Sequence, residues 1–310
     1  MIEVQSIVKR YGATVAVNNV SFRVDRGEIL GFLGPNGAGK STTLKILTCF
    51  IVADSGKVSV DGHDVLEESL EVRRRIGYLP ENTPLYPDMR VEDYLEFISR
   101  IRQIPPTQKH ARLDHVIQTT GIERMLKKNI GHLSKGYRQR VGLAQAMIHD
   151  PPILIMDEPT AGLDPHQIIE MRELIKELGK TKTILFSSHI LQEISAICSR
   201  IIIIKEGRII ADGTPKGLQE RAAGGSVYRV SIQGPAEAVQ LKLSAVSGVQ
   251  SAKLVEQAGG FGQYLVHVSD GKDLGPEIFR TAKESGWTLS RLDEVSRTLE
   301  DVYLQLTEKK

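Results

Sequence analysis

A glycine-rich stretch between two apolar segments has the residue types and spacing of a phosphate-binding loop. It follows the pattern Gly-x4-Gly-Lys-Ser and consists of Gly34, Pro35, Asn36, Gly37, Ala38, Gly39, Lys40, Ser41 and Thr42. Glycines let the backbone curl so that successive N–H groups point at phosphate oxygens, and the helix expected next adds the positive end of its dipole. We expect Lys40 to reach the β- and γ-phosphates of a nucleotide and the Ser41 hydroxyl to bind Mg²⁺. A glycine turn that binds nothing is the alternative, and the strand-to-helix context disfavours it.

Two adjacent carboxylates, Asp157 and Glu158, follow an apolar run downstream of this loop. Open α/β sheets bind ligands at the carboxyl ends of their strands, where these side chains are expected to lie. Asp157 would hold Mg²⁺ through a water molecule, and Glu158 would polarise the water that attacks the γ-phosphate. An acidic turn at the end of a strand is the alternative, and the phosphate-binding loop upstream favours the catalytic interpretation.

The composition is that of an ordinary globular protein. The chain has 310 residues, of which 41% are hydrophobic and 25% charged, and this length favours one large domain and one small domain. The 40 basic residues are nearly balanced by 38 acidic ones, so we expect no nucleic-acid partner. The two cysteines, Cys49 and Cys198, are expected to be buried free thiols in a reducing cytoplasm. We expect no signal peptide, because the start of the chain, residues 1–4, has no basic segment followed by an apolar one. We also expect no membrane span, because no run approaches about 18 apolar residues.

Hydrophobic periodicity predicts an α/β domain with a helical insert. Strands are expected at residues 2–8, 14–24, 57–60, 75–79, 153–156, 183–187 and 200–205. The last three are continuous apolar runs, as expected for parallel strands that are covered on both faces. Apolar residues at helical spacing begin at Val91, and Thr107 is the expected N-cap of a second helix, so residues from about 85 to 150 are predicted to form the insert.

A smaller α+β domain is expected beyond Gly213, where the composition changes. Thr214 and Pro215 favour the start of a short helix, and residues 222–226 resemble a linker. The predicted order is then strand, helix, strand, strand, helix, strand, at residues 227–232, 235–243, 249–256, 263–269, 275–285 and 287–293. This order is typical of a ferredoxin-like domain. A capping box at residues 298–301 is expected to begin a last helix.

Between the two nucleotide motifs, the segment Leu133-Ser134-Lys135-Gly136-Tyr137 resembles the signature motif of ABC-transporter ATPases, usually Leu-Ser-Gly-Gly-Gln. In that family the signature contacts the ATP of the opposite subunit. The resemblance therefore implies that Ser134 and Gly136 touch the γ-phosphate bound by a partner, in a head-to-tail homodimer or heterodimer. Ser134 can also cap the helix that follows. A capped amphipathic helix explains these residues alone, but it does not explain their place between the other motifs.

Three further positions match the family, and a fourth departs from it. Asp164 ends a segment that resembles the D-loop, and His189 follows an apolar strand as the family's switch histidine does. Tyr11 matches the aromatic residue that stacks on adenine. Glu81 stands where the family has glutamine, and a carboxylate there can still coordinate Mg²⁺.

The resemblance implies a P-loop NTPase with the ABC ATPase fold over residues 1–220: a parallel sheet core, an N-terminal antiparallel β subdomain and the helical insert. Residues 221–310 would form the ferredoxin-like accessory domain. It also implies hydrolysis of ATP to ADP and phosphate. Lys40, Glu158 and His189 would be catalytic, and Ser41, Glu81 and Asp157 would hold Mg²⁺.

The implied role is a cytoplasmic subunit, peripheral to the inner face of the cell membrane, that powers transport through transmembrane permease subunits on separate chains. Glu81 and the segment Leu-Glu-Asp-Val-Tyr at residues 299–303 are similar to ATPases of ABC-2-type exporters, and among these to gliding-motility-associated ATP-binding subunits.

Two other functions are open to the same motifs. A soluble ABC ATPase that acts on ribosomes or DNA is disfavoured, because translation-factor types carry two cassettes and chromosome-maintenance types place long coiled coils between the phosphate loop and the signature. A nucleotide sensor without turnover is disfavoured by the presence of both Glu158 and His189.

Overall fold

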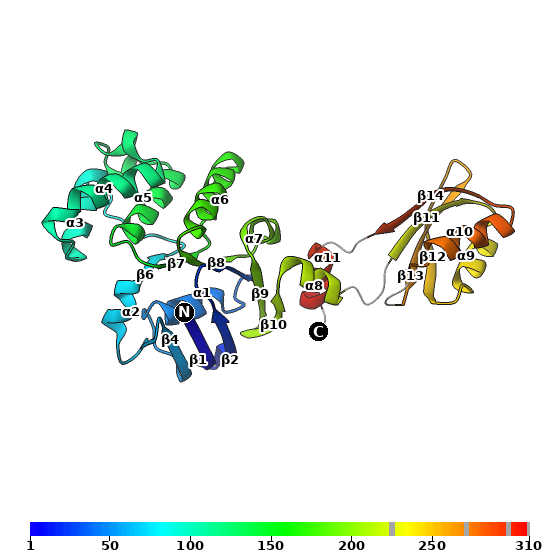
Figure 1. Cartoon of the computed structure of the whole chain (residues 1–310), viewed down its shortest axis with the longest axis horizontal. Coiled ribbons are helices and arrows are strands. Elements are labelled where there is room, and N and C mark those ends of the chain that lie inside the picture. Colours follow the sequence, from blue (N-terminus) through cyan, green and yellow to red (C-terminus); the bar gives the residue numbers. More distant parts are fainter. Residues whose placement is uncertain (223–226, 270–272, 296–298, 309–310) are drawn as a thin grey trace. The chain divides into compact units, whose positions relative to one another are not determined.

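The computed structural model describes residues 1–222, 227–269, 273–295 and 299–308. The chain divides into two compact units, Met1–Pro215 and Lys216–Lys310 (Figure 1). Most of the expected linker at 222–226, and the first residue of the expected capping box at 298–301, lie outside the described residues.

The first unit is built on a six-stranded sheet with the order β10-β9-β3-β8-β7-β6. Its strands are β3 (Ile29–Leu33), β6 (Ile76–Leu79), β7 (Ile153–Asp157), β8 (Thr183–Ser188), β9 (Arg200–Lys205) and β10 (Arg208–Gly213). All neighbours pair in parallel except β9 and β10, which are antiparallel. Every residue of β7 and β8 is buried, which explains why the sequence shows continuous apolar runs there.

An antiparallel sheet with the order β2-β1-β4-β5 packs on the same core. Its strands are β1 (Ile2–Tyr11), β2 (Thr14–Val24), β4 (Ser55–Val60) and β5 (His63–Asp64). Strand β1 is longer than predicted, because its pairing with β2 continues to Tyr11 opposite Thr14. The rings of Phe22 in β2 and Phe32 in β3 lie 5.4 Å apart, so aromatic packing joins the two sheets.

Helices complete the first unit: α1 (Lys40–Leu47), α2 (Ser69–Arg75), α3 (Val91–Ile101), α4 (Pro106–Thr120), α5 (Lys135–Met147), α6 (Pro165–Gly179) and α7 (Leu191–Ile197). The prediction that Thr107 caps a helix is wrong. Helix α4 begins at Pro106 with Pro105 at the N-cap position, because proline is favoured in a first turn, where its missing N–H has no intrahelical partner. Cys198 is buried, but Cys49 is only half-buried, so the expectation of two buried thiols holds for one of them.

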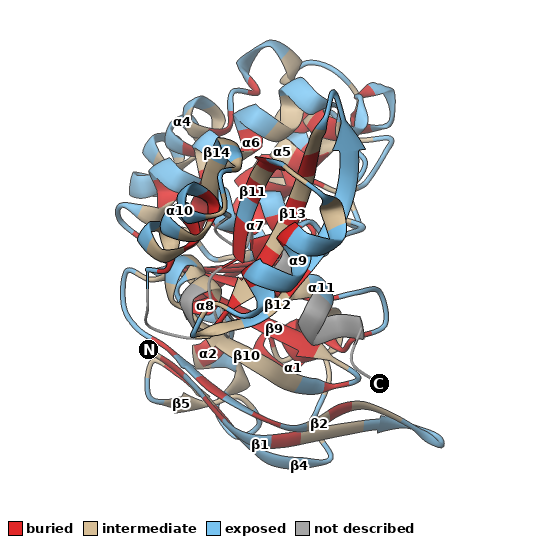
Figure 2. Cartoon of the chain, turned by 90° about the vertical axis from the view of Figure 1, so that its right-hand side faces the viewer, coloured by how far each residue is buried: buried red, intermediate tan, exposed pale blue. Residues whose placement is uncertain are grey.

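Helix α8 (Pro215–Ala222) crosses the boundary into the second unit, which contains a four-stranded antiparallel sheet with the order β12-β13-β11-β14. Its elements are β11 (Val227–Gln233), α9 (Ala236–Ser244), β12 (Val249–Ala258), β13 (Phe261–Val268), α10 (Gly275–Glu284) and β14 (Thr288–Val295), and α11 (Leu299–Glu308) follows. Strand β13 alternates between buried and half-buried residues, while α9 buries only Val239 and Leu243 and exposes most of its other residues (Figure 2). This is the predicted ferredoxin-like arrangement. The two units together confirm the predicted α/β fold class.

Candidate active site

The glycine-rich loop joins β3 to α1, and close backbone approaches require two of its glycines. A Cβ at Gly34 would overlap the carbonyl oxygen of Ile204 in β9. Gly39 has a φ of 103°, and a Cβ there would overlap the carbonyl oxygen of Ala16 in β2. Only glycine adopts the backbone of Gly39 without strain, and at both positions the absence of a Cβ lets the loop pack against both sheets immediately before α1.

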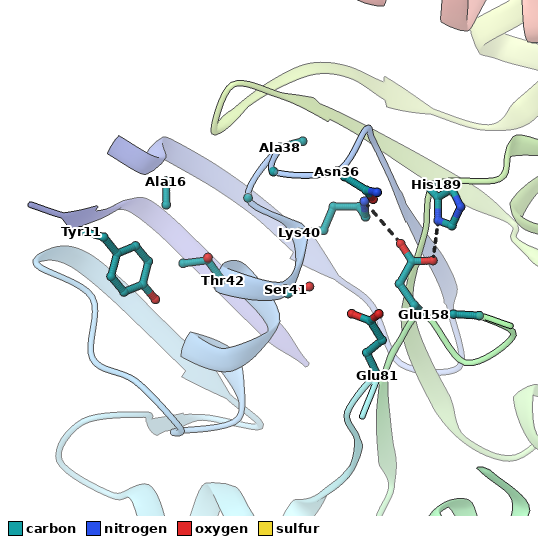
Figure 3. Close-up of a pocket in the computed structure, with 13 residues that line it drawn as sticks. Tyr11, Ala16, Asn36, Ala38, Lys40, Ser41, Thr42, Glu81, Glu158 and His189 are labelled. Atoms are coloured by element: carbon teal, nitrogen blue, oxygen red, sulfur yellow. Dashed lines mark hydrogen bonds and ion pairs between the residues drawn. The ribbon is translucent and has the colours of Figure 1, made fainter. Parts of the chain in front are cut away.

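The Lys40 ammonium lies inside the loop, and the residue is only 5% exposed. It donates hydrogen bonds to the carbonyl oxygens of Gly34, at 2.7 Å, and Pro35, at 3.2 Å. Its Nζ also lies 3.4 Å from Oε1 of Glu158 (Figure 3). A buried ammonium requires such partners, since desolvating an unpaired charge is costly. The lysine therefore lies between the loop and the candidate catalytic carboxylate.

The acidic pair and the histidine reach the same edge of the sheet because β7 and β8 are parallel neighbours. Oδ1 of Asp157 accepts a hydrogen bond from the Ser41 hydroxyl at 3.0 Å. Oε2 of Glu158 lies 2.9 Å from Nδ1 of His189, so the Glu158 carboxylate lies between Lys40 and His189 (Figure 3). The structure thus brings together all five of these predicted site residues.

Ser187 is a site residue that the sequence-based prediction missed. Its buried hydroxyl donates to Oδ1 of Asp157 at 2.6 Å and accepts from the backbone N–H of Glu158 at 3.0 Å. Glu158 has a φ of 49°, an unusual value for a residue other than glycine. The Ser187 hydroxyl thus helps to hold this turn. The sequence shows only that Ser187 ends an apolar run. Its place opposite Asp157 follows from the parallel pairing of β7 and β8, which periodicity does not determine.

A cavity of about 470 Å³ extends from Tyr11 at one end to Glu158 and His189 at the other (Figure 3). It is lined by Tyr11, Ala16, Asn36, Gly37, Ala38, Gly39, Lys40, Ser41, Thr42, Glu81, Glu158, Ala161 and His189. Ala16 and Ala161 were not predicted, because alanine carries no chemical signal in the sequence. Gly34 and Pro35 do not line the cavity and act through their carbonyl contacts with Lys40.

Asp157 lines a neighbouring cavity of about 480 Å³ instead, together with Ser41 and Glu81, which border both cavities. Tyr78 also lines this second space, and burial, with a smaller contribution from Asp157, raises the pKa of its hydroxyl. The three predicted Mg²⁺ ligands therefore surround the start of α1, on the side where the two cavities meet.

The signature residues lie apart from the Lys40 cavity. Ser134 caps α5 and accepts from the Tyr137 N–H at 3.4 Å, and Asp164 caps α6 and accepts from the Gln167 N–H at 2.9 Å. A Cβ at Gly136 would lie 2.5 Å from Oε1 of Gln167, so α6 packs closely on the start of α5. Gly136 and Asp164 line a cavity of about 400 Å³ of their own. Among the described residues, Ser134, Gly136 and Asp164 do not border the Lys40 cavity of the same chain.

Sequence comparison identifies related proteins. The family model described as ABC transporter matches residues 17–161. Nod factor export ATP-binding protein I of Burkholderia lata is 37% identical over 99% of this chain and 96% of its own length. Linearmycin resistance ATP-binding protein LnrL of Bacillus subtilis is 32% identical over 83% of each protein. These relatives are named for export and resistance, not for gliding motility.

Solved structures show the same fold. The ATP-binding subunit of an ABC transporter, 32% identical, superposes with a TM-score of 0.65 over 71% of this chain and 92% of its own. The dimeric ABC transporter cassette MJ0796, 26% identical, has a TM-score of 0.64 over 69% of this chain and 98% of its own. MJ0796 has also been solved as a dimer bound to ADP and phosphate. Within the described residues, no helix is both long and apolar enough to cross a membrane.

Proposed function

This chain belongs to the ABC transporter family as an ATP-binding subunit of exporter type, and on that premise we propose that it hydrolyses ATP to drive an ABC-2-type exporter. The observation that carries the proposal is the convergence of Lys40, Glu158 and His189 on one cavity behind the glycine-rich loop. Glu158 would polarise the attacking water, while Lys40 and His189 would contact the γ-phosphate. Positioned charges in a water-poor site are the usual source of catalysis in phosphoryl transfer.

Mg²⁺ fits the donor set on this side of α1. Ser41 and Asp157 present oxygen atoms 3.0 Å apart, and Glu81 borders the same cavity. The described residues contain no group of three or more His, Cys, Asp or Glu side chains that could form a metal cage. Mg²⁺ commonly uses one or two carboxylates together with water and substrate phosphates. When bound, it would neutralise charge on the phosphates, while Ser41 and Asp157 would hold it in place.

We propose that two chains close head to tail, with the signature face of one completing the Lys40 cavity of the other. The separation of Ser134 and Gly136 from that cavity within one chain supports this arrangement. ATP binding would close the dimer, and hydrolysis would reopen it. The test is to mix two inactive variants, Lys40→Ala and Gly136→Asp. In a dimer of one Lys40→Ala chain and one Gly136→Asp chain, one site combines the intact loop of the second chain with the intact signature of the first. We therefore expect the mixture to regain ATP turnover that neither variant shows alone. Turnover equal to the sum of the separate variants would contradict the head-to-tail homodimer.

The permease is proposed to dock near Leu85, Tyr86 and Pro87. Tyr86 is 51% exposed, and its ring packs against Tyr94 and Phe97 of α3, which fixes an aromatic surface at the edge of the helical insert. Pro84, which precedes Leu85 in the chain, lines a cavity together with Ser41 and Asp157, so the segment that carries this surface starts beside the proposed metal ligands. Tyr86→Ala should uncouple transport and leave basal ATP hydrolysis intact. Loss of nucleotide binding in this variant would count against the assignment.

For the second unit we propose a role in supporting or regulating the dimer at the inner face of the membrane. The proposal is motivated by the predicted linker at residues 222–226 and by the terminal helix α11. The match to Nod factor export ATP-binding protein I covers 99% of this chain and so includes this unit. Deleting residues 221–310 should weaken ATP-dependent dimerisation, measured by size-exclusion chromatography with ATP and the Glu158→Gln variant. Full retention of the dimer would contradict a supporting role.

A further inference from the structure

A buried carboxylate that is not among the proposed catalytic residues connects the loop that carries Glu158 to the loop that carries His189. Glu193, in α7, is only 1% exposed. Its Oε2 accepts hydrogen bonds from the Thr160 hydroxyl at 2.6 Å and from the Ser188 hydroxyl at 2.8 Å. Its other oxygen, Oε1, is buried and has no hydrogen-bond partner among the described residues. Burying a carboxylate is unfavourable unless it is well paired, so this one is retained at a cost.

The two hydroxyls flank the proposed catalytic residues. Thr160 belongs to the turn after β7, where the Ala161 N–H donates to the carbonyl oxygen of Glu158 at 3.0 Å. Ser188 is the last residue of β8, immediately before His189, and its hydroxyl also accepts from the Ile190 N–H at 3.0 Å. One carboxylate oxygen therefore joins the loop that carries Glu158 to the loop that carries His189.

These loops need an external constraint. Glu158 has the left-handed φ of 49°, a conformation that costs about 1–2 kcal/mol for a residue with a Cβ and that persists only when the surroundings fix it. The His189 side chain is 46% exposed, and its Nδ1 lies 2.9 Å from Oε2 of Glu158. The relative position of the two side chains therefore depends on how their loops are held.

We propose that Glu193 is a positioning residue for ATP hydrolysis. Its carboxylate clamps Thr160 and Ser188 together, so that Glu158 and His189 keep the geometry in which they face the cavity. This inference rests on the proposed function, because it assigns Glu193 a role in that same reaction. Glu193 acts through the two hydroxyls and does not border the cavity itself.

Helix α7 is seated independently of this carboxylate. A Cβ at Gly31 in β3 would lie 2.5 Å from Cγ2 of Ile194 and 2.7 Å from Sγ of Cys198, so the helix and the residue after it pack directly on the central strand. Removing the Glu193 carboxylate should therefore leave the helix in place and release mainly the two loops. A positional effect can thus be separated from a loss of folding.

The test compares Glu193→Ala with Glu193→Gln in the full chain. The alanine removes both ties, whereas the glutamine amide oxygen has two lone pairs and can accept both hydroxyls. We expect Glu193→Ala to lower kcat by about 10- to 100-fold, the usual effect of losing a supporting hydrogen-bond partner or of misplacing a reacting group by about 1 Å. The KM for ATP should change little, and Glu193→Gln should recover most of the lost kcat. Gln192→Ala, exposed on the same helix, is the matched control and should behave as wild type.

The outcomes separate this inference from the function on which it rests. If the wild type hydrolyses ATP and Glu193→Ala does so at the same rate, the positioning role of Glu193 is overturned while the proposed ATPase function stands. Two results would show that Glu193 has a purely structural role. In one, Glu193→Gln is as impaired as Glu193→Ala; in the other, kcat and ATP binding both fall in parallel with the Tm. If Glu193→Ala does not fold, Thr160→Val and Ser188→Ala remove the ties one at a time. Each should lower kcat at unchanged KM, and wild-type kcat in both would also overturn the clamp.

Discussion

Replacing Ser187 by alanine tests how the acidic pair is held. The Ser187 hydroxyl is fully buried, accepts the Glu158 N–H at 3.0 Å and donates to Asp157 at 2.6 Å. In Ser187→Ala the N–H of Glu158, a buried residue, loses its acceptor. Asp157 keeps the hydroxyl of Ser41.

The magnitude follows from these two bonds. An orphaned buried N–H costs about 1–3 kcal/mol, and a hydrogen bond to a charged group contributes about 1.5–3 kcal/mol. Since Asp157 retains one partner, we expect the free energy of unfolding of the first unit to fall by about 3 kcal/mol. For a unit of this size about 1 kcal/mol corresponds to 2–4 °C, so the Tm should fall by about 6–12 °C.

Calorimetry of the full chain measures the Tm, and release of phosphate from ATP measures the effect on turnover. We expect turnover below the Tm to fall as well, because the strained turn at Glu158 loses a support. Ser195→Ala is the control, since Ser195 is exposed on α7 and its hydroxyl donates only a long 3.4 Å bond to the Gln192 carbonyl. A Ser187→Ala variant with the wild-type Tm and turnover would refute the reasoning.

Three further changes have defined outcomes. Burial lowers the pKa of His149 to about 4, from 6.5, so between these pH values the unfolded chain binds more protons than the folded chain. The free energy of unfolding should therefore fall by up to about 3 kcal/mol as the pH falls from about 6.5 to 4. His149→Gln should lose less stability than the wild type between pH 7 and pH 4.5 in urea unfolding, and equal losses in the two proteins would contradict this role of the histidine. Gly34→Ala should abolish ATP binding, measured by calorimetric titration, because its Cβ would overlap the Ile204 carbonyl oxygen and displace the loop; retained affinity would show that the loop can shift freely. Tyr11→Ala should weaken ATP binding by about 1 kcal/mol, roughly fivefold, through loss of stacking, while Tyr11→Phe should bind as wild type; equal affinities of all three proteins would contradict the stacking role.

Local sequence patterns predicted much of this fold because the responsible forces are local. The continuous apolar runs at β7 and β8 identified parallel strands, since burial on both faces leaves no position for polar residues. The glycine-rich loop was recognisable because its backbone geometry restricts residue type directly at Gly34 and Gly39. The start of α4 was mispredicted because Pro106 competes with Thr107 as a first-turn signal.

What the sequence did not predict depends on contacts between distant segments. Ser187 meets Glu158, and Glu193 meets Thr160, only because the sheet places β8 beside β7. No local pattern marks a buried serine or glutamate as a support for a turn elsewhere in the chain. The order of strands in the sheet is likewise set by tertiary packing rather than by periodicity.

The most direct measurement is the rate of phosphate release from ATP by the purified chain and by Glu158→Gln, with Glu173→Gln as an exposed-carboxylate control. We predict that the wild type and the control release phosphate at the same rate. Glu158→Gln should still bind ATP but turn it over about 10²- to 10⁴-fold more slowly, the usual contribution of a positioned general base. Equal rates for the wild type and Glu158→Gln would contradict the assignment of Glu158 as the residue that activates water.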